Sequence, residues 1–216
     1  DKVYRNNEWD RGYIENDILD GFDPYSNSKS CSELVTSSYK NAFLNPLGIA
    51  VSTCRAGNVI GGGDFAKDRI IPDCVRAMQK GEKIIVRNPF SIRPYQHVLE
   101  PICAYVLVAI RQLESPEIAS NYNVGPDYSD CVSTGDLVDL FCSFWPGAKR
   151  ENRAETNAPH EAGLLKLDCS KIKKELEWKP RWNISSAVEK TVVWSRAYLN
   201  EENIKDIMVH QIKENL

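Results

Sequence analysis

The sequence lacks the features that would mark a membrane protein or a metalloprotein. No apolar run approaches the roughly 20 residues that a membrane-spanning helix needs. Its 7 cysteines include no pair at the CxxC spacing, and its 3 histidines show no metal-ligand spacing with Cys, Asp or Glu. We therefore predict no membrane partner, no metal site, and reduced, buried structural cysteines in a cytoplasmic protein.

An excess of positive charge is absent as well. Lys and Arg total 27 against 30 Asp and Glu, which gives a net charge of −3. This balance argues against a nucleic-acid-binding surface. The chain has no internal repeats and no low-complexity linker, and its 216 residues suffice for one large or two small domains.

The dinucleotide-binding fingerprint is a further absence. Gly61, Gly62 and Gly63 are consecutive, so they lack the GxGxxG spacing that is expected at a strand-to-helix turn. We interpret this segment as a flexible loop where the backbone approaches a nucleotide.

The pattern of apolar residues predicts alternating strands and helices. In the first part of the chain we expect a helix from Pro24 to about Asn45, a buried strand over 48–54, a glycine-rich loop over 55–64 and a helix over 70–79. A strand over 83–87, an irregular segment over 88–97, a helix over 100–113, a strand over 121–125 and a helix over 133–144 should follow. The last part should contain a loop with a short strand over 159–168 and helices over 170–177, over 185–198 and from about 201. This alternation indicates an α/β fold. Ligands bind at the carboxyl ends of strands in such folds, so the loop after the 48–54 strand marks a candidate site.

Tyr25 and Lys29 are the first candidate catalytic residues. Their spacing of four places both side chains on one helix face. The ammonium can hold a ribose and lower the pKa of the phenol, so that a phenolate takes a proton from a carbinol while a hydride leaves for a nicotinamide. The same spacing is common on ordinary helices, and here the cap at Asp23–Pro24 and the later strand and glycine-rich loop favour the catalytic interpretation.

Asp1 and Lys2 form a second acid/base pair, and Lys2 precedes Tyr25 by 23 residues. An exposed pair at a strand end is the alternative.

Several segments resemble a known family. Segments 23–29, 55–61 and 176–180 resemble the extended short-chain dehydrogenase/reductase family that acts on nucleotide sugars. Within that family, the CDP-glucose 4,6-dehydratase branch is resembled by segments 58–64, 68–73, 86–89 and 92–101. The resemblance runs from Asp1 to about Trp194. It implies a partial Rossmann-type doubly wound sheet with a smaller α/β substrate domain. Residues 1–62 would be the second part of the NAD-binding domain, and 63–216 mainly the sugar-nucleotide domain, with some segments returning to the sheet.

The resemblance also implies catalytic roles and NAD as an internally recycled cofactor. Tyr25 would take the proton of the sugar 4-hydroxyl, and Lys29 would hold the nicotinamide ribose. Asp1 would protonate the departing 6-hydroxyl, and Lys2 would assist removal of the C5 proton. The Asp-Lys pair resembles the CDP-glucose branch, whereas the dTDP-glucose branch has Asp-Glu.

Substrate-binding residues implied by the resemblance are Asn58, Arg69, Arg93 and His160. Asn58 would bind the sugar, or else form a turn, and the arginines would bind the diphosphate because guanidinium groups offer several cationic donors. His160 is a further candidate for the nucleotide, with an exposed loop histidine as the alternative. The expected partner is a small-molecule nucleotide sugar, and the full-length protein is expected to be a homodimer or homotetramer.

The resemblance covers about the C-terminal two-thirds of a complete enzyme. The glycine-rich turn for the adenosine end of NAD is not in these residues. We therefore expect the isolated chain to be inactive and to leave one sheet edge bare. Two alternatives stay open: another nucleotide-sugar 4,6-dehydratase or 4-epimerase, and an inactive nucleotide-sugar-binding fragment.

Overall fold

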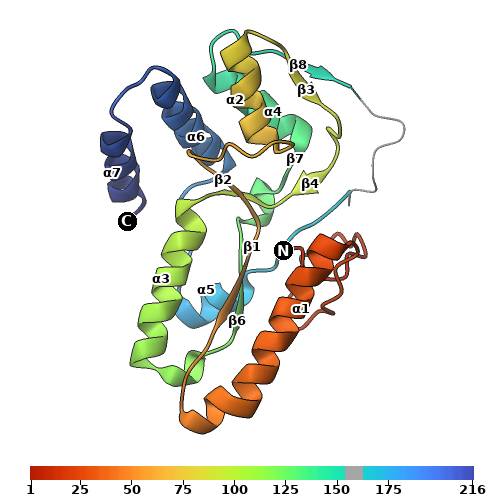
Figure 1. Ribbon diagram of the computed structural model, residues 1–216, viewed down its shortest axis with the longest axis vertical. Coiled ribbons are helices and arrows are strands. Elements are labelled where there is room, and N and C mark those ends of the chain that lie inside the picture. The colour runs from red at the N-terminus through yellow and green to blue at the C-terminus, as the bar shows by residue number, and fades with distance from the viewer. Residues whose placement is uncertain (154–162) are drawn as a thin grey trace.

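The computed structural model describes residues 1–153 and 163–216 and has a mixed α/β architecture (Figure 1). Its α-helices are α1 (Pro24–Tyr39), α2 (Ile70–Lys80), α3 (Leu99–Glu114), α4 (Thr134–Phe144), α5 (Ser170–Leu176), α6 (Ile184–Leu199) and α7 (Ile204–Asn215). Six of them begin and end within a few residues of their expected positions, because apolar residues at helical spacing and capping residues mark helices locally. The first was expected to reach about Asn45, but α1 ends at Tyr39 and continues as a π-helical turn (Lys40–Leu44) and a 3-10 turn (Asn45–Leu47). None of the described helices is long and apolar enough to cross a membrane.

The strands are short and pair over long sequence distances. They are β1 (Thr53–Ala56), β2 (Asn58–Ile60), β3 (Ile84–Val86), β4 (Ile92–Arg93), β5 (Tyr95–His97), β6 (Asn121–Val124), β7 (Val132–Ser133) and β8 (Arg150–Asn152). Three pairs are parallel, namely β1 with β6, β2 with β5 and β3 with β8, while β4 and β7 are antiparallel. Parallel pairing requires a crossover through helices, which agrees with the predicted α/β class.

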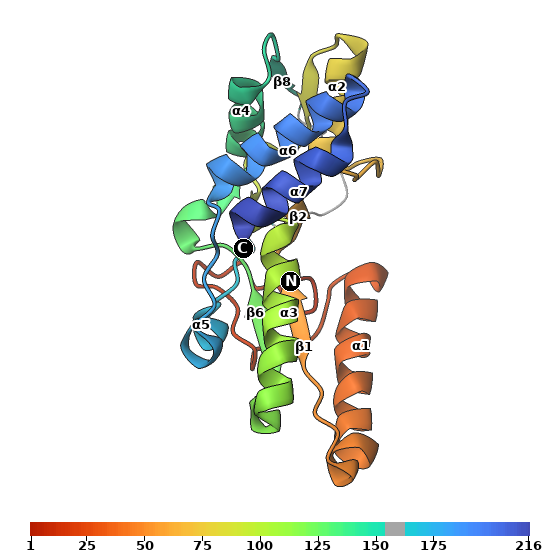
Figure 2. The ribbon, with the colours of Figure 1, turned by 90° about the vertical axis from the view of Figure 1, so that its left-hand side faces the viewer.

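The buried side chains form two clusters. The first, which we call the strand core, gathers around β6 and α3 and includes Tyr4, Tyr13, Val108, Tyr122 and Val124. The second, which we call the helical core, gathers around α2, α4 and α6 and includes Ile71, Ile84, Leu137, Phe141 and Val188. Figures 1 and 2 show these helices at one end of the molecule, and α1, α3 and the β1–β6 pair at the other. The division of the chain between 62 and 63 stays a prediction.

Three sequence-based expectations need correction. The expected strand over 48–54 begins only at Thr53, because Gly48 closes the preceding helical turn with φ of 70° and Ile49 is exposed. The supposed loop over 55–64 contains the end of β1 and all of β2, and the supposed irregular segment over 88–97 contains β4 and β5. These strands depend on partners distant in the chain, which local periodicity does not reveal.

Cysteine burial also differs in part from the expectation. All seven thiols are unpaired; Cys74 and Cys169 are buried as predicted, whereas Cys31 is exposed on α1.

The N-terminal end of α1 is fixed by capping and by a close backbone approach. Asp23 accepts hydrogen bonds from the backbone nitrogens of Tyr25 (2.9 Å) and Ser26 (3.0 Å), and Pro24 occupies the first turn. A Cβ on Gly21 would lie 2.2 Å from the carbonyl carbon of Ser26, so only glycine fits there. Ser30 Oγ donates to the Val3 carbonyl (2.7 Å) and thereby ties α1 to the segment that carries Asp1 and Lys2.

Candidate active site

A cleft of about 780 Å³ lies between the strand core and the helical core. It is lined by the N-terminal residues, by the first three turns of α1, by the region where β1 leads into β2, by the start of α2 and the segment before it, and by the end of β3 and the segment after it. In Figure 1, α2 (gold) lies above the region where β1 leads into β2, and α1 (red) lies below it. The cleft brings together all four predicted catalytic residues, namely Asp1, Lys2, Tyr25 and Lys29.

Tyr25 and Lys29 both line this cleft from the first two turns of α1. The Lys29 ammonium nitrogen lies 5.4 Å from the centroid of the Tyr25 ring. Tyr25 is 59% exposed, so its hydroxyl is open to a ligand. The ammonium and the phenol therefore lie side by side on one helix face, with both groups on the cleft.

Asp1 and Lys2 line the same cleft, although Lys2 and Tyr25 are 23 residues apart in the sequence. The backbone nitrogen of Asp1 donates to the carbonyl of Ala56 (2.8 Å), which places Asp1 at the carboxyl end of β1. Its Oδ2 atom is buried and accepts no hydrogen bond from the described residues. A buried carboxyl oxygen without a partner is a place where a ligand hydroxyl can hydrogen-bond.

A buried polar network beneath the cleft supports this arrangement. The Arg55 guanidinium, on β1, donates to the Tyr4 hydroxyl (2.8 Å) and pairs with Glu33 Oε2 (3.0 Å) on α1. The side chains of Arg55 and Glu33 are only 2% and 11% exposed. Since Glu33 follows Lys29 by one helical turn, this ion pair fixes the catalytic face of α1 against β1.

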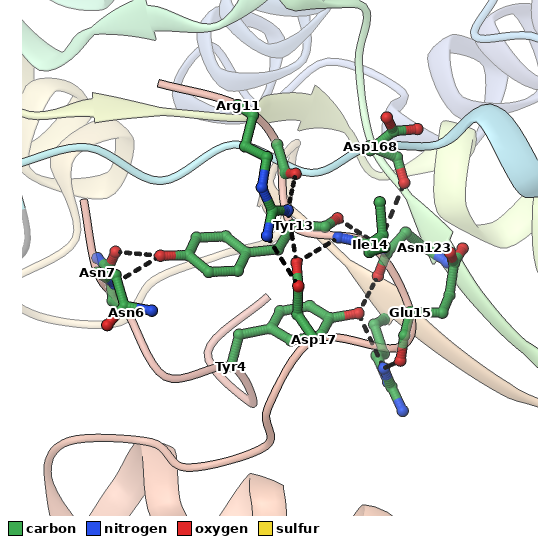
Figure 3. A network of polar contacts seen from close by, with 12 residues as sticks. Tyr4, Asn6, Asn7, Arg11, Tyr13, Ile14, Glu15, Asp17, Asn123 and Asp168 are labelled. Carbon is green, nitrogen blue, oxygen red and sulfur yellow. Dashed lines mark hydrogen bonds and ion pairs between the residues drawn. The ribbon is translucent and has the colours of Figure 1, made fainter. Parts of the chain in front are cut away.

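The network continues into the segment that follows Lys2 (Figure 3). Tyr4 donates to Asn123 Oδ1 (2.7 Å), and Asn123 Nδ2 donates to the Tyr13 carbonyl (2.8 Å). Tyr4 and Tyr13 stack with their ring centroids 5.4 Å apart. Burial raises the pKa of Tyr4 to about 12, so this phenol remains a hydrogen-bond donor at neutral pH.

The predicted substrate-binding residues are distributed unevenly. Asn58, on β2, and Arg69, the residue before α2, both line the cleft. Arg93, on β4, is 3% exposed, donates to the Ile92 carbonyl (2.9 Å) and is not part of the cleft lining. His160 lies outside the described residues. The substrate-binding roles of all four stay predictions.

Sequence reasoning missed other residues of the cleft. Arg55 and Glu33, which form the buried ion pair, line the cleft, and so does Arg87, directly after β3. Ser91 and Thr134 also line it, and their hydroxyl oxygens are 2.8 Å apart. Only Arg87 had a local signal, since it is a charged residue at the carboxyl end of a buried strand, where ligands bind in α/β folds.

Within the described ranges, no three His, Cys, Asp or Glu side chains come together in a way that could hold a metal ion.

The chain matches a family and several curated relatives. The family described as GDP-mannose 4,6 dehydratase matches residues 2–191. The chain is 44% identical to a CDP-glucose 4,6-dehydratase from Salmonella typhimurium, over 94% of this chain and 58% of the relative. It is 27% identical to a dTDP-glucose 4,6-dehydratase from Streptomyces antibioticus, over 80% of this chain and 49% of the relative. The chain therefore spans about half the length of the curated relatives that it matches.

Solved structures share its fold. A dTDP-glucose 4,6-dehydratase from Bacillus anthracis in complex with NAD matches 95% of this chain and 62% of its own, with a TM-score of 0.76 and 20% identity. A UDP-glucuronic acid 4-epimerase from Bacillus cereus in complex with UDP-glucuronic acid and NAD matches 91% of this chain and 59% of its own, with a TM-score of 0.76 and 17% identity. At these identities the likeness concerns the fold, and it confirms the predicted α/β, Rossmann-type class.

Proposed function

Because the chain belongs to the GDP-mannose 4,6-dehydratase family, we propose that it is part of a nucleotide-sugar 4,6-dehydratase that converts CDP-glucose to CDP-4-keto-6-deoxyglucose and water. The identity of 44% to a CDP-glucose 4,6-dehydratase supports this choice of substrate. The observation that carries the proposal is the meeting of Asp1, Lys2, Tyr25 and Lys29 in one cleft, since these residues supply the acid and base groups that the reaction needs.

The residues present fit the nicotinamide end of NAD. Tyr25 and Lys29 lie together and are accessible from the cleft, and the Lys29 ammonium can donate to the hydroxyls of a nicotinamide ribose. When bound, NAD would take a hydride from C4 of the sugar and return it to C6, so the cofactor would leave the cycle unchanged.

Proton removal at the 4-hydroxyl is the role of Tyr25. The phenol oxygen of Tyr25 is the proposed base that accepts this proton, and the Lys29 ammonium lies 5.4 Å from the centroid of its ring. Lys29 keeps its own proton in this step. The product at this position is a ketone at C4 of the sugar.

The elimination of water is the role of Asp1 and Lys2. A ketone at C4 makes the neighbouring C5 proton acidic, and the amine of Lys2 is the proposed base that takes that proton. The C5–H electrons form the C5–C6 double bond as the C6–O bond breaks, and Asp1 gives its proton to the departing oxygen, which leaves as water. The buried Oδ2 of Asp1, which no described group occupies, suits the binding of the 6-hydroxyl.

Binding of the nucleotide diphosphate is assigned to the cationic residues. We propose that Asn58 hydrogen-bonds to the sugar and that Arg69 contacts the diphosphate from the wall of the cleft. Arg93 and His160 complete the proposed set. We further propose a cytoplasmic protein that assembles as a homodimer or homotetramer.

The experiment is to offer CDP-, dTDP-, UDP- and GDP-glucose to the natural protein that carries this chain. Absorbance in base would follow the 4-keto product. We expect CDP-glucose to turn over; turnover of dTDP-glucose alone would refute the cytidine assignment. A change at C4 without loss of water would show the alternative, a 4-epimerase, for which the Asp1–Lys2 pair is not needed.

Lys2→Met separates the two steps. We expect this variant to spare oxidation at C4 more than elimination, and exchange of the C5 proton with solvent would report the difference. Equal loss of oxidation and elimination would contradict the role given to Lys2.

A further inference from the structure

The wall of the cleft on the side of α2 carries two guanidinium–carboxylate pairs. Arg69 pairs with Asp64 at 3.2 Å, and Arg87 pairs with Asp68 at 3.2 Å. All four residues line the cleft. The second pair links the segment before α2 to the residue after β3, so it bridges two elements at the cleft surface.

The Arg87–Asp68 pair is open to a ligand and adds little to the stability of the fold. Its side chains are 56% and 74% exposed, and ion pairs so open to water contribute little to folding. Asp68 also has a left-handed backbone with φ of 61°, which aspartate tolerates but does not favour. The structure thus holds a carboxylate beside a guanidinium at a surface that a ligand can reach.

The position of the pair follows the order of groups in a nucleotide sugar, and this step rests on the proposed function. The proposed function assigns the sugar to Tyr25 on α1 and the diphosphate to Arg69, where the positive end of α2 would add to the cationic charge. The base is the remaining group. Arg87 and Asp68 form a second charged pair on the same wall, and Asp68 immediately precedes Arg69.

We propose that Arg87 and Asp68 recognise the cytosine base by its hydrogen-bonding edge. Cytosine presents two acceptors, O2 and N3, beside the N4 amino donor. The Arg87 guanidinium donates to the two acceptors and the Asp68 carboxylate accepts from the amino group. Uracil and thymine present an N3–H donor and an O4 acceptor instead. They keep the O2 acceptor, so the guanidinium meets one acceptor and one N–H donor, which offset each other, and the carboxylate meets the O4 oxygen, which is a repulsive contact.

The test compares the binding of free CDP and free UDP to the natural protein by calorimetry. We expect the unchanged protein to prefer CDP by about tenfold or more. Arg87→Met should weaken CDP binding by about that factor and leave UDP binding nearly unchanged. Arg69→Met is the matched control, and it should weaken both nucleotides alike because both carry the same diphosphate.

Two further variants separate base recognition from charge. Arg87→Lys keeps the cation but loses the planar pair of donors, so the CDP preference should fall although the charge is kept. Asp68→Asn offers an amide that can donate to O4, so UDP should gain relative to CDP. A thermal melt of each variant would show that it is folded.

The outcomes distinguish this inference from the proposed function. If Arg87→Met weakens CDP and UDP equally, or leaves the preference unchanged, Arg87 does not read the base, and the dehydratase proposal stands on the turnover assay. If the unchanged protein binds neither nucleotide, the proposed function fails and this inference fails with it.

Discussion

Two of the arginine–carboxylate pairs at the cleft differ in what surrounds them. The Arg55–Glu33 pair is buried, with side chains 2% and 11% exposed, and the Arg87–Asp68 pair lies at the surface, with side chains 56% and 74% exposed. The same chemistry therefore serves two purposes. A buried pair cannot lose one partner without leaving an uncompensated charge, so it fixes backbone elements; an exposed pair can exchange partners with a ligand at little cost.

The largest expected effect comes from a change at the surface of the cleft that leaves its support intact. We expect Tyr25→Phe to lower turnover by at least about 10²-fold, because the phenol is the proposed base. The free energy of unfolding should barely change, since Tyr25 is 59% exposed. Rates of 4-keto product and urea unfolding measure the two effects. Tyr39→Phe is the matched control on the same helix, where a tyrosine is 58% exposed but does not line the cleft. Normal turnover by the Tyr25 variant would contradict its role.

Breaking the buried Arg55–Glu33 pair should instead lower the free energy of unfolding. Glu33→Ala leaves the Arg55 guanidinium buried without its counter-ion, and Arg55 Nε already has no hydrogen-bond partner among the described residues. We expect a loss of about 3–5 kcal/mol in the free energy of unfolding. Asp68→Ala, which breaks the exposed pair, should lose less than about 1 kcal/mol. Equal losses in urea unfolding would show that the two pairs do not differ as their burial indicates.

A buried group with no carboxylate partner in the described structure extends the comparison. Burial, with a smaller contribution from Lys190, lowers the pKa of His97 to about 4 from its ordinary value of 6.5. The ring packs edge-on against Trp182 with centroids 4.8 Å apart, and Nδ1 accepts from the Leu99 nitrogen (3.3 Å). The unfolded chain therefore binds a proton at a higher pH than the folded chain does.

This pKa difference predicts a pH dependence of stability. The contribution of His97 should be fully present above pH 6.5 and be lost as the pH falls from 6.5 to about 4, by about 3 kcal/mol in total. Urea unfolding across this range would measure the slope. His97→Gln keeps an acceptor but does not titrate, so its stability should fall less steeply; an identical slope would contradict the assignment to His97.

Among the buried contacts, the smallest expected effect concerns a neutral contact between α1 and the Asp1–Lys2 segment. Ser30 Oγ donates to the Val3 carbonyl (2.7 Å) and accepts from the Gly21 nitrogen (2.9 Å). Ser30→Ala leaves both backbone groups without this partner, and we expect a loss of about 2 kcal/mol. Ser28→Ala is the control, because that exposed hydroxyl bonds only within its own helix, to the Tyr25 carbonyl. Equal changes in the two variants would contradict a role for Ser30 in joining the segments.

Much of the fold could be predicted from the sequence, but its strands only in part. The helix that begins at Pro24 was predicted because Asp23 caps it and apolar residues follow at helical spacing. β2 was missed because Asn58–Ile60 becomes a strand only through its parallel pairing with Tyr95–His97. In the candidate site, Tyr25 and Lys29 were found from their spacing, whereas Arg87 had only a weak signal and Arg55 had none.

By itself, the sequence determined that Tyr25 and Lys29 share one face of a helix, because residues four apart meet wherever a helix forms. It also carried the resemblance that pointed to a nucleotide sugar. Only the tertiary structure decided that Asp1 and Lys2 line the same cleft, that Arg55 is buried against Glu33, and that Arg87 lies exposed beside Asp68. The physical reason is that helix geometry is fixed by neighbouring residues. Burial and long-range pairing depend instead on how distant segments pack against one another.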